Sequence, residues 1–196
     1  MLNILGNLSG IATNTREWVR RAAPVKVAAT RKTDWGILDK WAVHVGGGLT
    51  HRLNRGDAMM LKENDFASMK LKNEDDIDTL TRVISHIEYK GDFVIIEVQN
   101  LKNSLIIVDL WKNYLNRDSK IILLLDNMGP KLSKKVSLSL KEANLREYCI
   151  LEGSGNIVLD SIIKWSDSEV EVVSSSRLNR GISPLDLTMI FEGASK

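Results

Sequence analysis

The chain has 196 residues, which is enough for one domain with its own core and at most a small second unit. Hydrophobic residues make up 43% and charged residues 27%, values that are ordinary for a folded globular protein and argue against disorder. The net charge of +2 is too close to zero to indicate nucleic acid or a membrane surface as a partner. Any anion-binding site must therefore come from local clustering of basic side chains.

The cysteine content and the apolar runs bear on the compartment. Cys149 is the single cysteine, so an internal disulfide is excluded, which fits a reducing compartment. The longest apolar run, Ile121–Leu125, is far shorter than the roughly 20 residues that a transmembrane helix needs. The N-terminus lacks the basic segment and apolar block of a secretory signal. We therefore expect a soluble, cytoplasmic protein that does not enter a membrane.

Short apolar segments alternate with helical patterns along the chain. A helix that ends before Pro24 precedes a predicted strand at Val25–Ala29. Nearly continuous apolar runs at Phe93–Val98 and Lys120–Leu125 are typical of strands that are covered on both faces. Further strands, with less pronounced apolar patterns, are predicted at Asp57–Lys62, Tyr148–Leu151 and Val170–Val173.

The intervening segments have the spacing of amphipathic helices. Apolar residues recur on one helical face between Ile77 and Ile87, after an acidic start at Glu74–Asp76 that suits the helix dipole. Similar patterns run from Leu101 to Trp111 and from Pro130 to Leu140. Strands that alternate with helices predict βαβ units, and therefore an α/β fold with a parallel sheet.

The C-terminal segment breaks this alternation. Leu185–Phe191 has a strand-like pattern, follows Pro184, and is not followed by a helix. We expect it to be a strand that pairs with a partner outside the main sheet.

Two acidic residues stand at or near the ends of the most apolar strands, where α/β barrels carry their catalytic groups. Asp126 directly follows the run Ile121–Leu125, and an unpaired charge there would be expensive to bury. It is either a turn residue or helix cap beside Asn127, or a ligand for ribose hydroxyls or Mg²⁺. Glu97 interrupts a buried run in the same way, and a satisfied ion pair in the core explains it as well as a binding role does.

Basic residues cluster in the first third of the chain, where acids are few. Such a cluster is either a solvated face or an anion site. Arg31 and Lys32 end a predicted strand, and His51 and Arg52 follow Gly46–Gly48, where three glycines allow close backbone approach. An arginine in such a place can clamp a carboxylate through two hydrogen bonds, and His51 gains its interest from this neighbour. The full cluster is Arg31, Lys32, His51, Arg52, Arg55 and Lys62.

A third candidate element is the tripeptide Ser154–Asn156, between a predicted strand and the helix-like segment Ile157–Trp165. Free backbone N–H groups at a helix N-terminus bind phosphate, which the helix dipole also favours. An ordinary capped turn explains the same residues.

Together these motifs resemble the quinolinate phosphoribosyltransferase (nicotinate-nucleotide pyrophosphorylase) family. They occur in the family's order and cover nearly the whole chain, and the combination of TRKT, VGGGLTHRL and LLLDN is highly specific. The matching strings are Leu8–Thr13 (LSGIAT), Thr30–Thr33 (TRKT), Trp41–Leu53 (WAVHVGGGLTHRL), Asp57–Asn64 (DAMMLKEN), Ile96–Asn100 (IEVQN), Leu123–Met128 (LLLDNM), Leu151–Asn156 (LEGSGN) and Leu185–Met189 (LDLTM).

The resemblance implies an incomplete TIM-like α/β barrel with parallel strands, which we assign to residues 1–184. In the family an N-terminal α/β sandwich domain precedes this barrel, and residues 185–196 would hold the strand that pairs with that domain, which we expect to be absent here. The resemblance also implies a homodimer or higher homo-oligomer, because an arginine of the sandwich domain reaches a partner subunit's site. The chain would then be a fragment, have a mis-assigned start, or be completed by a separate N-terminal domain chain.

The implied reaction belongs to NAD biosynthesis. Quinolinate and phosphoribosyl pyrophosphate (PRPP) give nicotinate mononucleotide, pyrophosphate and CO₂, with Mg²⁺ as cofactor. Carried over by motif, Glu97 and Asp126 would hold the ribose hydroxyls and Mg²⁺–PRPP, and both would be catalytic together with Lys32. The quinolinate carboxylates and part of the pyrophosphate would be bound by Thr30, Arg31, Lys32, His51, Arg52 and Lys62. The 5′-phosphate would be bound by Ser154, Gly155, Asn156 and Ser176.

The chain departs from the family pattern at several positions. Glu63–Asp65 stand where the family usually has Asp followed by Asn-His, and Gln99 replaces an acid. Ser176 takes the place of a glycine in the last phosphate loop. Two alternatives to the enzyme therefore stay open: a partner-dependent subunit that binds PRPP without full catalysis, and a related phosphoribosyltransferase-like protein with another anionic substrate, such as the molybdenum-locus homologues.

Overall fold

The computed structural model describes residues 1–54, 56–87, 93–115, 120–190 and 193, and its centre is one sheet of six parallel strands. The strands lie in the order β1-β6-β5-β4-β3-β2, so β1 and β2 are the two edges. The strands are β1 (Lys26–Ala28), β2 (Met59–Leu61), β3 (Val94–Val98), β4 (Ile121–Asp126), β5 (Cys149–Ser154) and β6 (Val172–Ser174). The six strands predicted for the main sheet are thus confirmed, with somewhat different ends.

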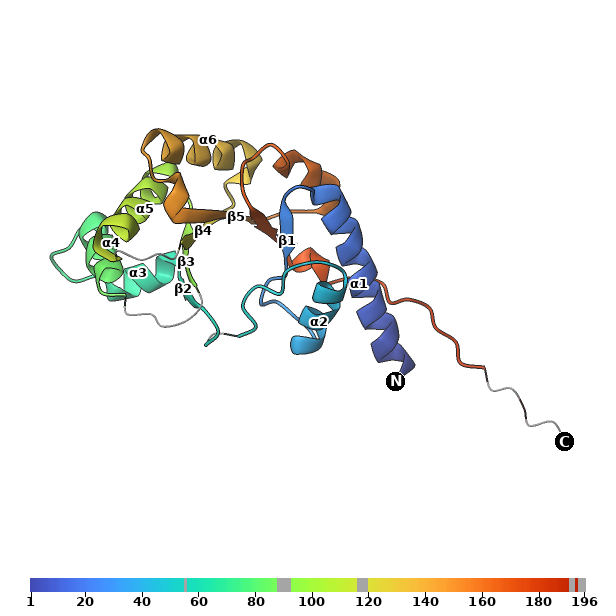
Figure 1. The fold of residues 1–196 in the computed structure, drawn as a ribbon. Helices are drawn as coiled ribbons and strands as arrows, with labels where there is room; N and C mark the ends of the chain where they lie inside the picture. Colours follow the sequence, from blue (N-terminus) through green and yellow to red (C-terminus); the bar gives the residue numbers. More distant parts are fainter. Residues whose placement is uncertain (55, 88–92, 116–119, 191–192, 194–196) are drawn as a thin grey trace.

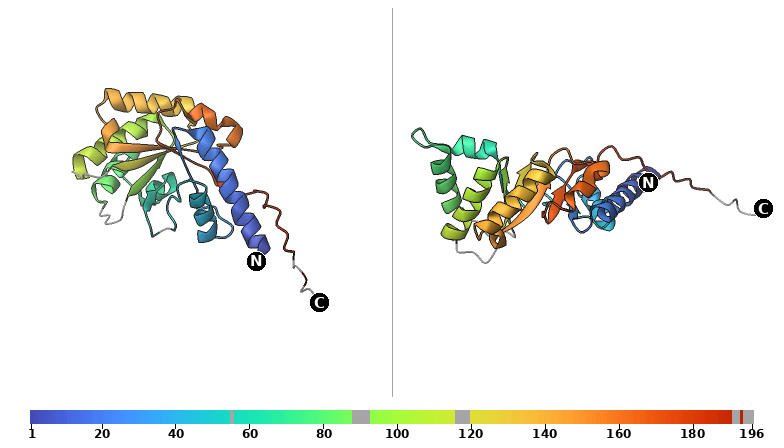
Figure 2. Two further views of the ribbon diagram at one scale, coloured as in Figure 1. Left: turned by 45° about the vertical axis from the view of Figure 1, so that its right-hand side comes forward. Right: turned by 90° about the horizontal axis from the view of Figure 1, so that it is seen from above.

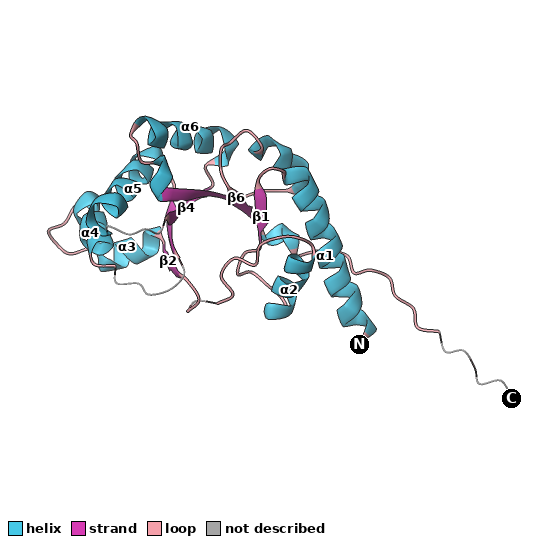
Figure 3. Ribbon diagram, viewed as in Figure 1, coloured by secondary structure: helices cyan, strands magenta, loops and turns pink. Residues whose placement is uncertain are grey.

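The sheet curves into an arc, and the helices lie along its outer side (Figures 1 and 3). This arrangement confirms an α/β fold with a parallel sheet, of the kind found in a TIM-like barrel. The α-helices are α1 (Leu2–Ala22), α2 (Ile37–Val45), α3 (Glu63–Met69), α4 (Asp76–Ser85), α5 (Leu101–Leu115) and α6 (Gly129–Glu142). Short 3-10 helices are η1 (Arg146–Tyr148), η2 (Leu159–Trp165) and η3 (Ser176–Leu178).

The arc is left open between β1 and β2, and the backbone at Leu49 occupies part of this gap. Leu49 N donates to Val27 O at 2.8 Å, and Ala29 N donates to Leu49 O at 2.9 Å. A single parallel bridge between Ala28 and Leu49 results. The segment that follows, which contains His51 and Arg52, is therefore held beside the end of β1.

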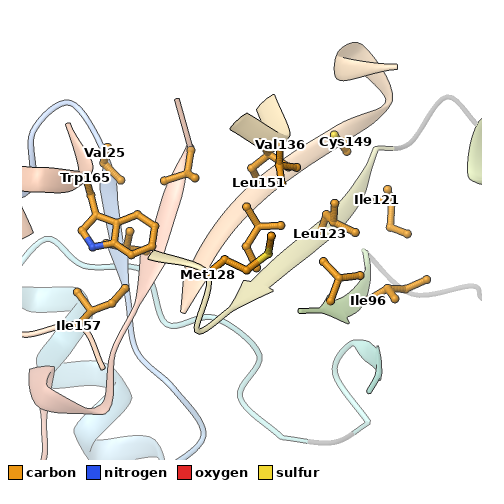
Figure 4. Close-up of a cluster of buried hydrophobic side chains, with 14 of the residues drawn as sticks. Val25, Ile96, Ile121, Leu123, Met128, Val136, Cys149, Leu151, Ile157 and Trp165 are labelled. Atoms are coloured by element: carbon orange, nitrogen blue, oxygen red, sulfur yellow. The ribbon is translucent and has the colours of Figure 1, made fainter. Parts of the chain in front are cut away.

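The hydrophobic core lies between the sheet and the outer helices (Figure 4). Successive strand residues point to opposite faces, so every second residue of a strand meets the helices. Leu123 and Leu151 are fully buried there, with Val136 and Leu140 of α6. Burial of this apolar surface is the main force that holds the helices on the sheet.

The inner face of the sheet changes character along the strands. Ile122 and Ile150 line an apolar cavity near the N-terminal ends of the strands. Asp126 and Ser154 line a separate, polar cavity at the C-terminal ends. Because parallel strands end on the same side, polar residues that each follow a different strand meet at one mouth.

Several sequence predictions need correction. The helices α2 and α3 were not predicted, and the segment after Asn156 forms the 3-10 helix η2 only from Leu159 onward. The tripeptide Ser154–Asn156 therefore does not stand at the N-terminus of an α-helix, and the helix-dipole explanation for phosphate binding there is wrong. No helix in the described part of the chain is long and apolar enough to cross a membrane.

The C-terminal segment is not a strand over its described residues. Leu185–Ile190 runs away from the barrel as an extended segment with exposed side chains (Figure 2), and Leu185 N donates to Gly6 O of α1 at 2.9 Å. Phe191, the last residue of the predicted strand, lies outside the described residues. The pairing of residues 185–196 with a further domain stays a prediction.

Gly153 provides a test of the packing between β5 and η2. A Cβ atom at Gly153 would lie 2.2 Å from Cζ3 of the buried Trp165 ring. We expect Gly153→Ala to lower the free energy of unfolding by roughly 1–3 kcal/mol, because the ring must move within a closely packed core. Urea unfolding measures the change, with Gly193→Ala as control, since nothing lies within 4 Å of a Cβ there. Equal loss in both variants would contradict this packing.

Candidate functional site

One cavity of about 700 Å³ opens at the C-terminal ends of the strands, and it gathers every candidate site residue. These residues come from segments far apart in the sequence, from the end of β1 to the end of β6. The twelve are Thr30, Arg31, Lys32, His51, Arg52, Lys62, Glu97, Asp126, Ser154, Gly155, Asn156 and Ser176. Arg55, the remaining member of the basic cluster, lies outside the described residues.

The loop after β1 is shaped by a buried carboxylate that the sequence analysis missed. Asp39, which is 1% exposed, accepts hydrogen bonds at Oδ2 from the backbone N–H groups of Asp34 (2.8 Å) and Trp35 (3.3 Å). Asn179 Nδ2 donates both to Asp39 Oδ2 and to Lys32 O. This network anchors the backbone of the loop, while the side chains of Arg31 and Lys32 carry no partner among the described residues and line the cavity.

A buried lysine holds the segment that contains His51 and Arg52. Lys40 is 2% exposed, and its Nζ donates to Thr50 O at 2.6 Å and to Arg52 O at 3.2 Å. Between these two carbonyls, His51 has a left-handed backbone with a φ of 54°. Residues other than glycine rarely adopt this backbone conformation, so the two hydrogen bonds from Lys40 offset a local backbone strain.

Both ring nitrogens of His51 are engaged inside the protein. Nδ1 accepts the backbone N–H of Arg52 at 2.8 Å, so the ring proton lies on Nε2, which contacts Glu152 Oε2 at 2.9 Å. Glu152 is 2% exposed and also lines the cavity. This geometry supports a role for His51 in holding Arg52, whereas direct binding of substrate by His51 stays a prediction.

The Arg52 guanidinium is directed across the opening between β1 and β2. Its Nη1 donates to Ala58 O at 3.3 Å, and its Nη2 approaches the sulfur of Met60 at 3.2 Å. Lys62, at the end of β2, forms an ion pair with Glu97 at the end of β3. Glu97 thus forms the ion pair that was one of its two explanations in the sequence analysis, and it also lines the cavity.

The ends of β4 and β5 are joined through Asn127. Asn127 N donates to Ser154 O at 2.9 Å, its Nδ2 donates to Asp126 Oδ2 at 2.8 Å, and its Oδ1 accepts from Asn156 Nδ2 at 3.0 Å. Gly155 has a φ of 90°, and a Cβ there would lie 2.2 Å from Asn127 Oδ1. Only glycine fits this close approach, which keeps Asp126 beside the Ser154–Asn156 turn.

Burial, and to a smaller extent the nearby Arg52 charge, lower the pKa of Lys40 from 10.5 to about 8, while the charges of Asp57 and Glu152 oppose the shift. The unfolded chain therefore binds more protons than the folded chain above pH 8, and stability contributed through Lys40 rises with pH in that range. An ammonium group there is costly to desolvate but is matched by two carbonyl acceptors.

This shift gives a pH-dependent prediction. Relative to Lys40→Met, which cannot titrate, the unmodified chain should gain about 1 kcal/mol of unfolding free energy between pH 7 and pH 9, because a pKa of about 8 must rise to about 10.4 on unfolding. Denaturant unfolding of both proteins at the two pH values measures it. A difference that stays constant with pH would show that Lys40 is not desolvated.

A curved parallel sheet with helices on its outer side, and a cavity lined by basic, acidic and hydroxyl side chains at the C-terminal ends of its strands, define the class as an α/β protein of the TIM-like barrel type. The family model for the quinolinate phosphoribosyl transferase C-terminal domain matches residues 11–190. The chain belongs to this family, which confirms the resemblance drawn from the motifs.

Individual relatives agree. The chain is 33% identical over 199 residues to a probable nicotinate-nucleotide pyrophosphorylase (carboxylating) of Methanothermobacter thermautotrophicus, covering 98% of this chain and 67% of the relative. It is 31% identical to quinolinate phosphoribosyltransferase (decarboxylating) 2a, mitochondrial, of Nicotiana tabacum, covering 96% of this chain and 54% of the relative.

Solved structures share the fold. NadC from Streptococcus pyogenes superimposes with a TM-score of 0.76 at 28% identity, over 94% of this chain and 60% of that one. The nicotinate-nucleotide pyrophosphorylase from Francisella tularensis gives 0.77 at 27% identity, over 96% and 62%. The chain thus spans about three fifths of the length of these neighbours.

Proposed function

We propose that this chain provides the phosphoribosyl-transfer site for the reaction of quinolinate with PRPP, which gives nicotinate mononucleotide, pyrophosphate and CO₂. The observation that carries the proposal is the convergence of all twelve candidate residues on one cavity. Both substrates carry several negative charges, so a site for the pair needs several cations, and five Lys and Arg side chains line this cavity. The names of the relatives and the family membership support the same reaction.

The cationic side of the mouth would bind quinolinate. Arg31 and Lys32 after β1, Arg52 in the gap and Lys62 after β2 line neighbouring parts of the cavity. Guanidinium groups bind carboxylates through two parallel hydrogen bonds, which fixes a planar acid in one orientation. Together with Thr30, and with His51 holding the Arg52 backbone, they would bind the two carboxylates and place the pyridine nitrogen toward the ribose.

The acids would hold the ribose hydroxyls and Mg²⁺ that accompanies PRPP. Glu97 and Asp126 line the same cavity, and the described residues contain no group of three or more metal-binding His, Cys, Asp or Glu side chains. One or two carboxylates plus substrate phosphates are what Mg²⁺ usually takes in proteins, so this donor set fits. When bound, Mg²⁺ would offset negative charge on the leaving pyrophosphate.

The chain's own residues would act mainly by charge and position. As the bond from the anomeric carbon to pyrophosphate breaks, positive charge grows on the ribose, and carboxylates near the ring stabilise it. Lys32 and Arg31 would stabilise the departing anion. The pyridine nitrogen then forms the new bond, CO₂ leaves from the ring carbon beside it, and the electron pair left on that carbon takes up a proton from solvent. The turn Ser154–Asn156 and Ser176 would hold the 5′-phosphate throughout.

Arg52→Ala tests the quinolinate side. We expect kcat/KM for quinolinate to fall at least about 100-fold, because a cation that is placed before the substrate arrives cannot be replaced by water. Product formation from quinolinate, PRPP and Mg²⁺ measures it, with Arg20→Ala on the exposed face of α1 as control. Unchanged turnover in a folded Arg52→Ala protein would reject this assignment.

Asp126→Asn tests the Mg²⁺–PRPP side. We expect the gain in PRPP affinity that Mg²⁺ provides to fall roughly tenfold, with quinolinate affinity unchanged, because the amide carries no charge. Titration calorimetry with and without Mg²⁺ measures both, and Asp160→Asn on η2, outside the cavity lining, is the control. The same Mg²⁺ dependence in Asp126→Asn and the unmodified chain would count against the role.

Assembly with a further chain would bury apolar surface that is exposed in this chain. A homo-oligomer, or a complex with a separate N-terminal domain chain, would cover the apolar face of α2, where Ile37, Trp41 and Val45 are each more than 60% exposed. Single exposed apolar residues are normal on protein surfaces, whereas several on one helix face indicate a surface that contacts another chain. The cytoplasmic location, likewise, stays a prediction from the sequence.

A further inference from the structure

The ends of β5 and β6 build one continuous wall of the cavity. The strands pair in register at Gly153 and Val173, so the residues that follow them lie side by side. Ser175 Oγ donates to Ile157 O at 2.9 Å and ties the two loops together. The wall consists of Ser154, Gly155, Asn156, Ile157, Val158, Ser174, Ser175, Ser176 and Arg177.

This wall differs chemically from the rest of the cavity, because it contains no carboxylate. The acids that line the cavity, Glu97, Asp126 and Glu152, come from other positions. The wall instead offers serine hydroxyls, an amide and backbone N–H groups, and Gly155 and Asn156 have left-handed backbones with φ of 90° and 53°. Hydroxyl, amide and backbone N–H groups are neutral donors that can bind anionic oxygens.

Arg177 supplies the single full positive charge on this wall. The other Lys and Arg side chains that line the cavity come from the segment between β1 and β2 and, for Lys62, from the residue directly after β2. Among the described residues, its guanidinium has no hydrogen bond or ion pair, whereas Arg20, Arg82 and Arg146 each pair with a glutamate.

The backbone of Arg177 is fixed, so its side chain starts from a defined place. Arg177 N donates to Ser175 Oγ at 3.2 Å. On the other side, Asn14 Nδ2 of α1 donates to the carbonyl oxygens of Arg177 and Leu178, each at 3.0 Å. Leu178 is fully buried and anchors η3 in the core. The residue thus combines a rigid base with an unpaired cationic head.

We propose that Arg177 is a further substrate-binding residue whose guanidinium binds the phosphate monoester of a 5-phosphorylated ribose. A phosphate dianion held by neutral donors alone would keep much of its charge uncompensated in a partly desolvated site, and a guanidinium supplies both charge and a pair of directed N–H groups. The inference rests on the proposed function, since that function places the 5′-phosphate at this wall. Arg177 adds a positive charge to the 5′-phosphate residues predicted from the motifs, which are all neutral.

Ribose 5-phosphate and pyrophosphate each represent one end of PRPP, so their separate affinities show which end a residue binds. Calorimetry on the full chain is compared for the unmodified protein, Arg177→Gln, Arg177→Lys and Arg16→Gln. The last removes the same charge from the exposed face of α1 and does not line the cavity. We expect Arg177→Gln to weaken ribose 5-phosphate binding roughly tenfold or more and Arg177→Lys to weaken it less. Pyrophosphate and quinolinate affinities should change less than about twofold.

The outcomes separate this inference from the proposed function. If the unmodified chain and Arg177→Gln bind ribose 5-phosphate equally, Arg177 has no such role, although product formation would still support the reaction. If Arg177→Gln weakens the binding of pyrophosphate or quinolinate as much as that of ribose 5-phosphate, the residue affects anion binding throughout the cavity, and the inference is overturned. If the unmodified chain binds neither PRPP nor ribose 5-phosphate, the proposed function itself fails. Circular dichroism confirms that each variant is folded.

Discussion

The two hydrogen bonds from the Lys40 ammonium to Thr50 O and Arg52 O are the constraint on which the mouth of the barrel depends. The arc of strands does not close between β1 and β2, and the bridge between Leu49 and Ala28 ends just before His51, so the described strand pairing does not extend to the His51 and Arg52 backbone. A buried cation attracts two carbonyls and bends the chain around His51, at the cost of desolvating the amine. Glu152 of β5 contacts the other ring nitrogen of His51 and so holds the ring in place. The position of Arg52 thus follows from two buried charges that face the same tripeptide.

The parallel sheet determines the order of chemistry around the mouth. Passing from the gap through β2, β3, β4, β5, β6 to β1, the cavity presents cations, then acids, then hydroxyl and N–H donors, then cations again. Because each group follows its own strand, and β2 to β6 are neighbours in chain order, the groups from Lys62 to Ser176 follow one another around the mouth as they do in the sequence, and β1 beside β6 brings Arg31 and Lys32 next to the last of them. A ribose bound over the acids would have the hydrogen-bond donors after β5 and β6 on one side and the cations of the gap and β2 on the other. The proposed arrangement of PRPP and quinolinate uses this order.

The sequence predicts those elements of the fold and the site that depend on continuous apolar runs and on the polar residues at their ends. The apolar runs of β3 and β4 are long and continuous, so the strands and the polar residues at their ends, Glu97 and Asp126, were predictable. The helix α3 was missed because its seven residues follow β2 directly with no apolar periodicity. Lys40, Asp39 and Glu152 were missed because a charged residue within a helix or strand reads as a solvated position. Some of their partners lie far away in sequence: His51 is 101 residues from Glu152, and Asn179 is 140 residues from Asp39.

The paired state of Glu97 shows why the structural and functional explanations of one residue do not exclude each other. Its ion pair with Lys62 satisfies a carboxylate that is mostly buried, and it also keeps a cation and an anion at neighbouring strand ends before any ligand arrives. Lys62 is about half exposed, so the pair costs little to separate in water. A polyanionic ligand with hydroxyl groups can then take both partners at once, its anion on Lys62 and its hydroxyls on Glu97. A mouth made only of cations would repel itself when empty, and the interleaved acids remove that repulsion while keeping each group in place.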